Sequence, residues 1–379
     1  MYRALPLVSI RMFYASYFAG MGLILPFFPI YLAGLGWDNG MVGLFVGILA
    51  FTKVLSPPVA GHLLDASRRR HAYITIFILA AVLSIVLLTM VAGNALALAL
   101  LLLIFGLAWS AALPLTDGIS LVAAEASLVD YGRLRVWGSI GFIVSSLAGG
   151  AWLVGSITSF PFALAGLLAI SAFAAMGFPV QTPSARASDR ESQAFSGHFR
   201  RLLVTSFAMQ ASHGAYYGFF SLYLIAAGYT GWQIGLLWSL GVLAEIVLMW
   251  RCSRPIQQVA PAYVLSICLL LAALRWMGTG WSESLALLVC MQLLHAATFA
   301  AFHVSAVTWV RKFAPGSRQA SAQGWYSASG FGLGTTLGVI ACGWLAEKAS
   351  YQSAFYVCAI IALLGLLASV RLPASAHIR

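Results

Sequence analysis

The sequence predicts an all-α polytopic membrane protein with twelve transmembrane helices in two pseudo-symmetric six-helix bundles. Hydrophobic residues make up 61% of the 379 positions and charged residues 8%, whereas an average soluble protein carries about 25% charged residues. The apolar runs are long and continuous, as a membrane helix of about 20 residues requires, and lack the alternation of a transmembrane β-barrel. The two halves of the chain can also be laid over each other.

Each apolar run is expected to form one helix, because lipid offers no hydrogen-bond partner to an exposed backbone. The runs of the first half lie at residues 7–33, 40–62, 72–92, 95–124, 133–155 and 158–179. Those of the second half lie at residues 202–227, 232–252, 260–279, 284–310, 322–346 and 351–372. The longest polar stretch predicts a cytoplasmic linker at 181–201, which separates an N-terminal bundle at 1–180 from a C-terminal bundle at 202–379.

The halves align without a gap when the sequence is shifted by 192 residues. The shift places Tyr31, Gly36, Gly43, Leu44 and Lys53 on Tyr223, Gly228, Gly235, Leu236 and Glu245. A second alignment places Trp137, Gly141 and Phe142 on Tyr326, Gly330 and Phe331. A charge at the centre of a membrane helix costs about 2.5 to 3.5 kcal/mol, so Lys53 and Glu245 indicate a partner, a wet cavity or a function. Parallel repeats are typical of transporters that bind substrate between their halves.

The basic residues predict the topology. With the N-terminus in the cytoplasm, only Lys348 of the 21 Lys and Arg residues falls in an outward loop, and Lys53 and Arg275 fall within helices. The remainder lie in inward loops or at inward ends, so both termini are expected in the cytoplasm of a bacterial inner membrane. The net charge of +11 is thus a signal of topology, and no nucleic-acid partner is expected.

The sequence gives little support to an enzyme or a metal protein. It contains no HExxH or GxSxG motif and no carboxylates with metal-ligand spacing. The five cysteines lie in or at the ends of apolar runs without CxxC spacing, which favours small core residues over ligands or disulfides. We therefore expect no metal and no cofactor, and a monomer whose partners are the lipid bilayer, a small-molecule substrate and protons.

The loop after the second predicted helix carries a family resemblance. Gly61, Asp65, Arg69 and Arg70 resemble the signature loop of the major facilitator superfamily, in which the aspartate ties the loop to a neighbouring helix and helps lock a gate. Arg68 stands where that family usually has a second glycine. A stop-transfer basic cluster would explain the arginines, but not Asp65 at this spacing. The corresponding loop of the second half lacks an aspartate.

A closer resemblance covers nearly the whole chain. Its strings are Pro114–Asp117, Asp130–Phe142, His213–Gly218, Leu237–Glu245, Leu274–Trp276 and Leu294–His295. Together they resemble the bacterial 3-phenylpropionate transporter family, which lies near the lactose permease type of proton symporter. The resemblance implies alternating access and proton-driven uptake.

Individual positions carry implied roles. Asp117 and Arg135 match the permease residues that bind sugar, and Arg275 and His295 match its proton-coupling region. Four positions depart from the permease. Thr298 stands where the permease has its proton-carrying glutamate, Gln292 stands where it has a lysine, and His213 stands where it has an aspartate. Glu245 lies one helical turn beyond the glutamate of the permease's eighth helix. The proton path cannot simply be copied across.

The residues themselves suggest where protons and substrate bind. Lys53, His213, Glu245 and His295 lie ten to fourteen residues from a helix end and hence near the midplane, at about 1.5 Å per residue. Glu245 is the preferred proton carrier, because a carboxyl group in an apolar cavity takes up a proton that a neighbouring cation can expel. Arg275 could be that cation, and the alternative is a permanent ion pair of Glu245 with Lys53 or Arg275.

The histidines titrate near physiological pH and can also hydrogen-bond a substrate. His213 and His295 are therefore candidates for coupling or binding, whereas His303 is better explained as a satisfied core histidine. Asp117 with Arg135 forms either a substrate clamp or a pair that holds two helices together. For an aromatic carboxylate, Lys53 or Arg135 would bind the anion. The rings available to cover it are Tyr14, Phe18, Tyr216, Tyr217, Trp238 and Trp276.

The leading hypothesis is a proton-coupled secondary active importer of a small organic solute, with an aromatic carboxylate such as 3-phenylpropionate as first candidate. A sugar or nucleoside symporter is the direct alternative, because Asp117 and Arg135 could equally bind hydroxyls. A drug or metabolite exporter of the same fold is a third possibility. A purely structural membrane protein would have no reason to bury these charges.

Overall fold

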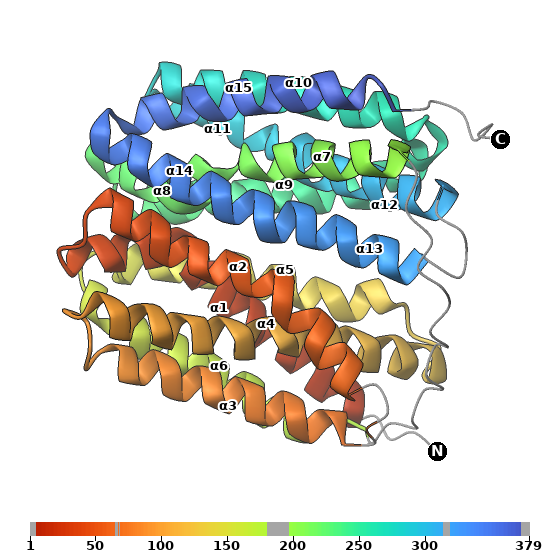
Figure 1. Cartoon of the computed structure of the whole chain (residues 1–379). Helices are drawn as coiled ribbons and strands as arrows, with labels where there is room; N and C mark the ends of the chain where they lie inside the picture. The colour runs from red at the N-terminus through yellow and green to blue at the C-terminus, as the bar shows by residue number, and fades with distance from the viewer. Residues whose placement is uncertain (1–4, 65–66, 68, 180–196, 314–318, 373–379) are drawn as a thin grey trace. The chain divides into compact units, whose positions relative to one another are not determined.

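The computed structural model describes residues 5–64, 67, 69–179, 197–313 and 319–372, and all regular secondary structure in these ranges is helical (Figure 1). The first half contains α1 Leu5–Gly34, α2 Asn39–Leu64, α3 Arg70–Leu88, α4 Ala95–Ala126, α5 Tyr131–Trp152, a 3₁₀ turn η1 Ile157–Ser159, and α6 Phe160–Met176. The predicted all-α fold is confirmed for this part of the chain.

The second half is more interrupted than the sequence predicts. Its helices are α7 Gly197–Ala211, α8 Gly214–Ala226, α9 Gly231–Gln258, α10 Pro261–Trp281, α11 Leu285–Leu293, α12 Phe302–Phe313, α13 Gln319–Ser327, α14 Thr335–Lys348 and α15 Tyr351–Ser369. Two π-helical turns, η2 Ala296–Ala301 and η4 Ala328–Gly334, lie within the expected helices at 284–310 and 322–346. Such turns occur frequently at functional sites.

Local side-chain caps explain several helix starts. The side chain of Asn94 accepts a hydrogen bond from the Ala97 N–H at 3.0 Å at the start of α4, and Asp130 caps α5 through the Gly132 N–H at 2.6 Å. Ser350 caps α15 in the same way. Short polar side chains satisfy first-turn N–H groups that have no partner inside the helix.

Eleven helical spans of the described residues are long and apolar enough to cross a membrane. The missing member of the expected twelve is the run at 202–227, which forms α7 and α8 with a break at Ser212 and His213. Ser212 Oγ donates to the Met209 carbonyl at 2.6 Å, and His213 Nδ1 contacts the same carbonyl oxygen at 2.8 Å. Side chains that bond to the local backbone compete with helix continuation.

Gly214 begins α8 immediately after this break and lies against the backbone of α14. A Cβ atom at this position would lie 2.3 Å from the carbonyl carbon of Gly338. We expect Gly214→Ala to lower the stability of the protein by about 1–3 kcal/mol, because a packed backbone must move to admit the methyl group. The matched control is Gly166→Ala in α6, where a Cβ would meet nothing within 4 Å. Equal denaturation midpoints for the two variants in detergent would contradict this prediction.

The chain divides into two compact units. Unit 1 contains α1, α2 from Leu55 onward, α3 to α6 and the segment Thr230–Leu236, whereas unit 2 contains Asp38–Val54, α7, α8 and the chain from Leu237 onward. In unit 1, α1 packs against α5 and α6, and α3 packs against α4 and α6. In unit 2, α7 packs against α15 and η4, and α10 packs against α15.

Two pairs of aligned residues have matching local structures. Gly36 and Gly228 have φ angles of +91° and +82°, in the left-handed region that glycine adopts readily. In both turns the next N–H closes on the carbonyl five residues earlier, at 3.3 Å and 2.9 Å, which is a Schellman helix end.

The second aligned pair is Gly141 and Gly330. Each lies against the first helix of its own half, since added Cβ atoms would lie 2.0 Å from the Ala15 carbonyl oxygen and 3.3 Å from that of Ser206. The internal alignments thus correspond to repeated structure in the two halves.

Candidate functional site

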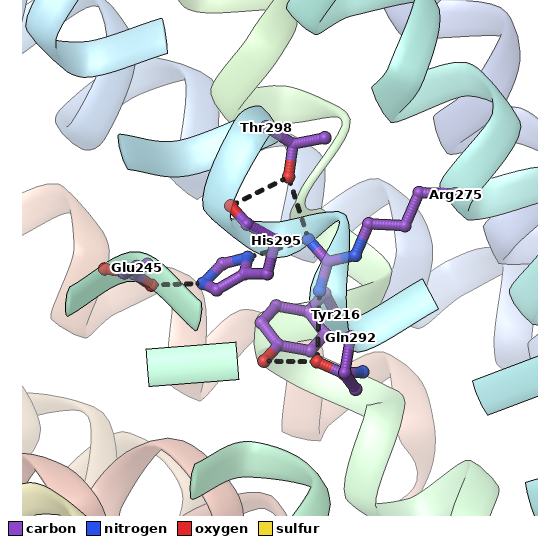
Figure 2. A network of polar contacts seen from close by, with 6 residues as sticks. All are labelled: Tyr216, Glu245, Arg275, Gln292, His295 and Thr298. Carbon is purple, nitrogen blue, oxygen red and sulfur yellow. Dashed lines mark hydrogen bonds and ion pairs between the residues drawn. The ribbon is translucent and has the colours of Figure 1, made fainter. Parts of the chain in front are cut away.

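A chain of charged and polar side chains lies inside unit 2 (Figure 2). Glu245 of α9 contacts His295 at 2.7 Å between Oε1 and Nε2, and Arg275 of α10 contacts the other ring nitrogen of His295, Nδ1, at 2.7 Å from Nη1. His295 lies between α11 and η2. The Arg275 residue is fully buried, and the side chains of His295 and Glu245 are 6% and 17% exposed. The three residues form a carboxylate–imidazole–guanidinium relay.

Arg275 has further polar partners. Its Nη1 donates to Thr298 Oγ1 at 3.1 Å and its Nη2 donates to Gln292 Oε1 at 3.3 Å (Figure 2). Gln292 Oε1 also accepts a hydrogen bond from the Tyr216 hydroxyl at 3.2 Å. Multiple hydrogen bonds of this kind are what allow a charge to remain buried.

Two aromatic faces complete the surroundings of the cation. The guanidinium carbon lies 4.5 Å from the centre of the Tyr216 ring and 4.3 Å from that of Trp276. Cation–π contacts at this range stabilise a desolvated guanidinium. Arg275 is therefore held on several sides, while its Nε atom is buried without a hydrogen-bond partner in the described part of the structure.

The chemistry of the partners fixes the hydrogens of the relay. A guanidinium can only donate, so His295 Nδ1 must accept and must carry no hydrogen. The neutral ring then carries its hydrogen on Nε2 and donates it to Glu245. A proton added at Nδ1 would set two N–H groups against each other at 2.7 Å. The carboxylate of Glu245 is thus the group of the relay that can take up a proton without breaking the contact with Arg275.

This arrangement corrects the expected pairing of Glu245. The ion pair that the described residues form joins Glu245 to His295, and neither Lys53 nor Arg275 pairs with Glu245 directly. Arg275 reaches the carboxylate only through the imidazole ring. The alternative of an ion pair with Lys53 or Arg275 failed because the sequence shows buried polar residues in several helices but not which two helices bring a pair of them into contact. Lys53, on α2, is half-buried and belongs to unit 2.

His213 lies beside the relay at the break between α7 and α8. It is fully buried, and its ring centre lies 6.1 Å from that of His295 and 4.9 Å from that of Trp276. Its Nδ1 contacts the Met209 carbonyl at 2.8 Å, while Nε2 has no partner among the described residues. The structure therefore places both histidines in one cluster with Arg275.

The aromatic residues expected to cover a substrate ring pack chiefly against one another. Tyr216 and Trp238 are each 2% exposed and stack with ring centres 4.4 Å apart, and the Trp238 indole N–H donates to Ser221 Oγ at 2.9 Å. Tyr217 is half-buried and stacks on His213 with ring centres 5.7 Å apart. In this conformation these rings support the relay residues.

A second polar group lies in unit 1. Asp117 Oδ1 of α4 accepts hydrogen bonds from the hydroxyls of Tyr14 at 2.6 Å and Tyr131 at 3.0 Å. Arg135 of α5 lies over the Phe18 ring at 3.9 Å and faces the Tyr14 ring at 5.3 Å. Asp117 and Arg135 do not form an ion pair here, so the alternative in which they hold two helices together is wrong for this conformation.

Gly138 permits this arrangement of Arg135. A Cβ atom at Gly138 would lie 2.9 Å from the nearer guanidinium nitrogen and 2.9 Å from the Phe18 ring. Arg135 itself is half-buried. A guanidinium that rests on aromatic rings and has no carboxylate partner in the described residues can receive an anionic group from outside.

The expected gating loop is only partly described. Asp65 lies outside the described residues, and Gly61 falls within α2. Arg69 occupies the position before α3 and is exposed, its N–H donating to Ser67 Oγ at 3.1 Å, and Arg70 is the first residue of α3. The gating role of these residues stays a prediction.

His303 and the cysteines fit simple structural roles. His303 Nδ1 is hydrogen-bonded to the Tyr326 hydroxyl at 2.9 Å, in agreement with a satisfied core histidine. Cys268, Cys342 and Cys358 are buried, whereas Cys252 and Cys290 are exposed and do not belong to the core. Within the described ranges, no three His, Cys, Asp or Glu side chains gather where they could hold a metal ion.

Sequence reasoning assigned no role to Gln292 and Thr298, which both bind Arg275. Their spacing was a usable signal, because Gln292, His295 and Thr298 recur every three residues within an apolar run. Tyr14 and Tyr131 were likewise not recognised as partners of Asp117, and their hydroxyl groups gave no signal distinct from ordinary membrane tyrosines.

Comparisons with known proteins agree on one kind of protein. The model of the MFS_1 like family matches residues 7–357. A probable 3-phenylpropionic acid transporter of Escherichia coli (strain K12) is 30% identical over 363 residues, covering 92% of this chain and 93% of the relative. The maltose permease of Geobacillus stearothermophilus is 26% identical over 366 residues, covering 94% and 92%. The crystal structure of the nucleoside transporter NupG has a TM-score of 0.81 at 19% identity, covering 98% and 99%.

Proposed function

The chain belongs to the MFS_1 like family and is a multi-pass membrane transporter of the major facilitator fold, and from this premise we propose that it imports a small aromatic carboxylate by proton coupling. The first candidate substrate is 3-phenylpropionate. The relatives and structural neighbours of the chain are membrane transporters and not enzymes. We further propose a monomer in the bacterial inner membrane, with both termini cytoplasmic and two bundles joined by the linker at 181–201.

The relay in unit 2 supports proton coupling. Glu245 can exist with or without a proton while His295 keeps its contact with Arg275, so protonation alters the charge of the cluster without dismantling it. A ligand shifts a conformational equilibrium only by binding one state better than the other. A proton on Glu245 that changes the relative stability of the two access states would satisfy this requirement.

The free guanidinium in unit 1 supports a carboxylate as substrate, and this is the observation that carries the proposal. Arg135 lacks a carboxylate partner among the described residues and lies on the Phe18 ring, so an anionic group and an aromatic ring could bind side by side. Guanidinium binds carboxylates through two parallel hydrogen bonds. The 30% identical relative, described as a probable 3-phenylpropionic acid transporter, points to the same substrate class.

A sugar or nucleoside is the second candidate, favoured by the surroundings of Asp117. Its carboxylate and the hydroxyls of Tyr14 and Tyr131 form a hydrogen-bonding group that also suits substrate hydroxyls. The maltose permease and NupG among the similar proteins are consistent with this reading. A metabolite exporter shares the fold and differs in the direction of net transport.

Uptake into proteoliposomes tests these alternatives. Purified protein is reconstituted, an inward proton gradient is imposed, and accumulation of labelled 3-phenylpropionate, lactose and uridine is measured with and without a protonophore. We expect gradient-dependent accumulation of the aromatic acid, with competition by other aryl carboxylates. Accumulation of uridine or lactose alone would support the second candidate, and gradient-driven loss of preloaded solute would indicate an exporter.

Arg135→Ala should weaken substrate binding. We expect the half-saturation concentration for the aromatic acid to rise about 10- to 100-fold, because a hydrogen bond to a charged group contributes about 1.5–3 kcal/mol. The half-saturation concentration of Arg135→Lys should lie between those of Arg135→Ala and the wild type, since lysine keeps the charge but not the two-donor geometry.

Lys53→Ala serves as the comparison, because Lys53 is the other cation predicted to bind the anion. An unchanged half-saturation concentration in Arg135→Ala, with a raised value in Lys53→Ala, would transfer the anion site to Lys53.

A further inference from the structure

Polar atoms without partners lie along one face of α7. Ser206 Oγ, Gln210 Oε1 and His213 Nε2 have no hydrogen-bond partner within the described structure. Their residues are 1%, 3% and 0% exposed. Residues three and four positions apart share a helix face, so Ser206 and Gln210 stand one above the other on α7, and His213 follows them at the break beyond Ala211. These residues are called the α7 polar face.

Several other buried helical serines are satisfied locally, although Ser305 of α12, like Ser206, has no partner among the described residues. Ser84, Ser120 and Ser171 each donate to the carbonyl oxygen four residues earlier, at 2.7, 2.7 and 3.1 Å. Ser206 does not form this bond, although it lies in a helix of the same kind. Its hydroxyl therefore has both its donor and its acceptor capacity available.

The ring of His213 offers a bare acceptor to the same face. Its Nδ1 contacts the Met209 carbonyl, which can only accept, so Nδ1 carries the hydrogen of the neutral ring and Nε2 carries a lone pair. Buried acceptors without a donor are uncommon in folded proteins, and ordered water is their usual partner. Three such atoms on one face can share a short row of water molecules.

The neighbouring element approaches the middle of the α7 polar face with its backbone. The π-helical turn η4 packs against α7 and places Gly330 beside Gln210, where a Cβ atom would come within 3.3 Å of Gln210 Cγ. Because this residue is glycine, the backbone of η4 can lie close to α7. π-helical turns such as η4 occur frequently at functional sites.

The His213 end of the α7 polar face meets the relay. The titratable or charged groups near His213 are Tyr216 and Tyr217 of α8, Arg275 of α10, and His295, whose ring centre is 6.1 Å away. The row of unpartnered atoms thus begins at the relay and continues along α7 toward Gly197.

We propose that the α7 polar face binds ordered water that carries protons between the Glu245–His295 pair and the Gly197 end of α7. This inference rests on the proton coupling of the proposed function. A hydronium ion in the row gives a proton to His213 Nε2, where an N–H bond forms as a hydronium O–H bond breaks and a neutral water remains. The imidazolium then returns the proton from the same nitrogen to the next water, which becomes the hydronium ion. The Nδ1–H group stays on the Met209 carbonyl throughout.

The transport test removes the polar atoms without altering the relay. In proteoliposomes, the double variant Ser206→Ala with Gln210→Leu should lower gradient-driven uptake about tenfold or more, within the range that positioned proton-transfer groups contribute. Substrate counterflow, which needs no net proton movement, should stay within about twofold of wild type. The matched control is Ser84→Ala, which removes a buried serine hydroxyl from α3 and should leave both rates unchanged.

A second measurement detects the water itself and does not depend on transport. Brief X-ray radiolysis turns bound water into hydroxyl radicals that label adjacent side chains. Met209 is fully buried beside His213, and Tyr223 is equally buried with its hydroxyl bonded to the Thr279 carbonyl at 2.9 Å. After correction for intrinsic reactivity, Met209 should be labelled several times faster than Tyr223 in the wild type. In the double variant, Met209 should be labelled at about the same rate as Tyr223.

The outcomes separate this inference from the function on which it rests. Wild-type protein that shows no gradient-driven uptake would overturn the proposed function and the proton role together. If the wild type and the double variant show the same gradient-driven uptake, this inference is overturned and the proposed function stands. Labelling of Met209 at the rate of Tyr223 in wild type would show that the face is dry and would overturn it as well.

Discussion

Glu245→Gln is expected to abolish proton-driven accumulation while leaving substrate exchange intact. The glutamine carbonyl can still accept the hydrogen bond that His295 Nε2 donates, so the geometry of the relay is preserved. The amide cannot ionise, however, and the variant has one charge state where the wild type has two. Internal substrate should therefore rise only to the external concentration, because a carrier without coupling equilibrates its substrate.

The measurement compares gradient-driven uptake and counterflow in the same proteoliposomes. Glu283→Gln is the matched control, because Glu283 is an exposed carboxylate at the start of the segment that leads into α11. Its uptake should equal that of wild type. Uphill accumulation by Glu245→Gln would remove Glu245 from the coupling role and would direct attention to the histidines.

Arg275→Met should be the most destabilising of the substitutions considered. Removal of the guanidinium leaves Glu245 without its counter-charge and His295 Nδ1 without its donor, and it leaves the Gln292 carbonyl with the Tyr216 hydroxyl as its remaining donor in Figure 2. Breaking a buried charge pair from one side costs about 3–5 kcal/mol. We expect a loss of this size in the free energy of unfolding measured by SDS titration.

The double variant Arg275→Met with Glu245→Gln distinguishes charge from packing. Replacement of both members of a buried pair is often nearly neutral, so the double variant should recover most of the lost stability. Arg251→Ala is the control for loss of an arginine, because Arg251 is exposed on α9 and its guanidinium carbon lies 4.6 Å from the centre of the Trp250 ring. If the double variant is no more stable than Arg275→Met, the relay contributes packing and not charge compensation.

The sequence was sufficient for the membrane fold and for the internal repeat. Long apolar runs leave helices as the only open solution in lipid, because each helix satisfies its own backbone. The alignment of Gly36 with Gly228 also held in detail, since both glycines adopt positive φ in the same helix-ending turn. Such features depend on residues close together in the chain, and the sequence contains them directly.

The partners of the buried charges could not be obtained in this way. The sequence left Lys53 and Arg275 open as partners for Glu245, and only the packing of α9 against the α11–η2 junction selected His295. The breaks in the predicted helices were equally hidden. His213 interrupts the run at 202–227 through a local bond to Met209, and the close approach of Gly214 to α14 that accompanies the break joins residues far apart in the chain.

By itself the sequence determined that the chain is an all-helical membrane transporter with a duplicated architecture and a polar centre. The tertiary structure decided that Glu245 reaches Arg275 through His295, and that Asp117 is satisfied by tyrosine hydroxyls while Arg135 remains free of a carboxylate in the described residues. The physical reason is the separation along the chain of the residues on which each feature depends. Burial and helix formation follow from composition along the chain, whereas hydrogen bonds between helices depend on rotations and depths that many distant contacts set together.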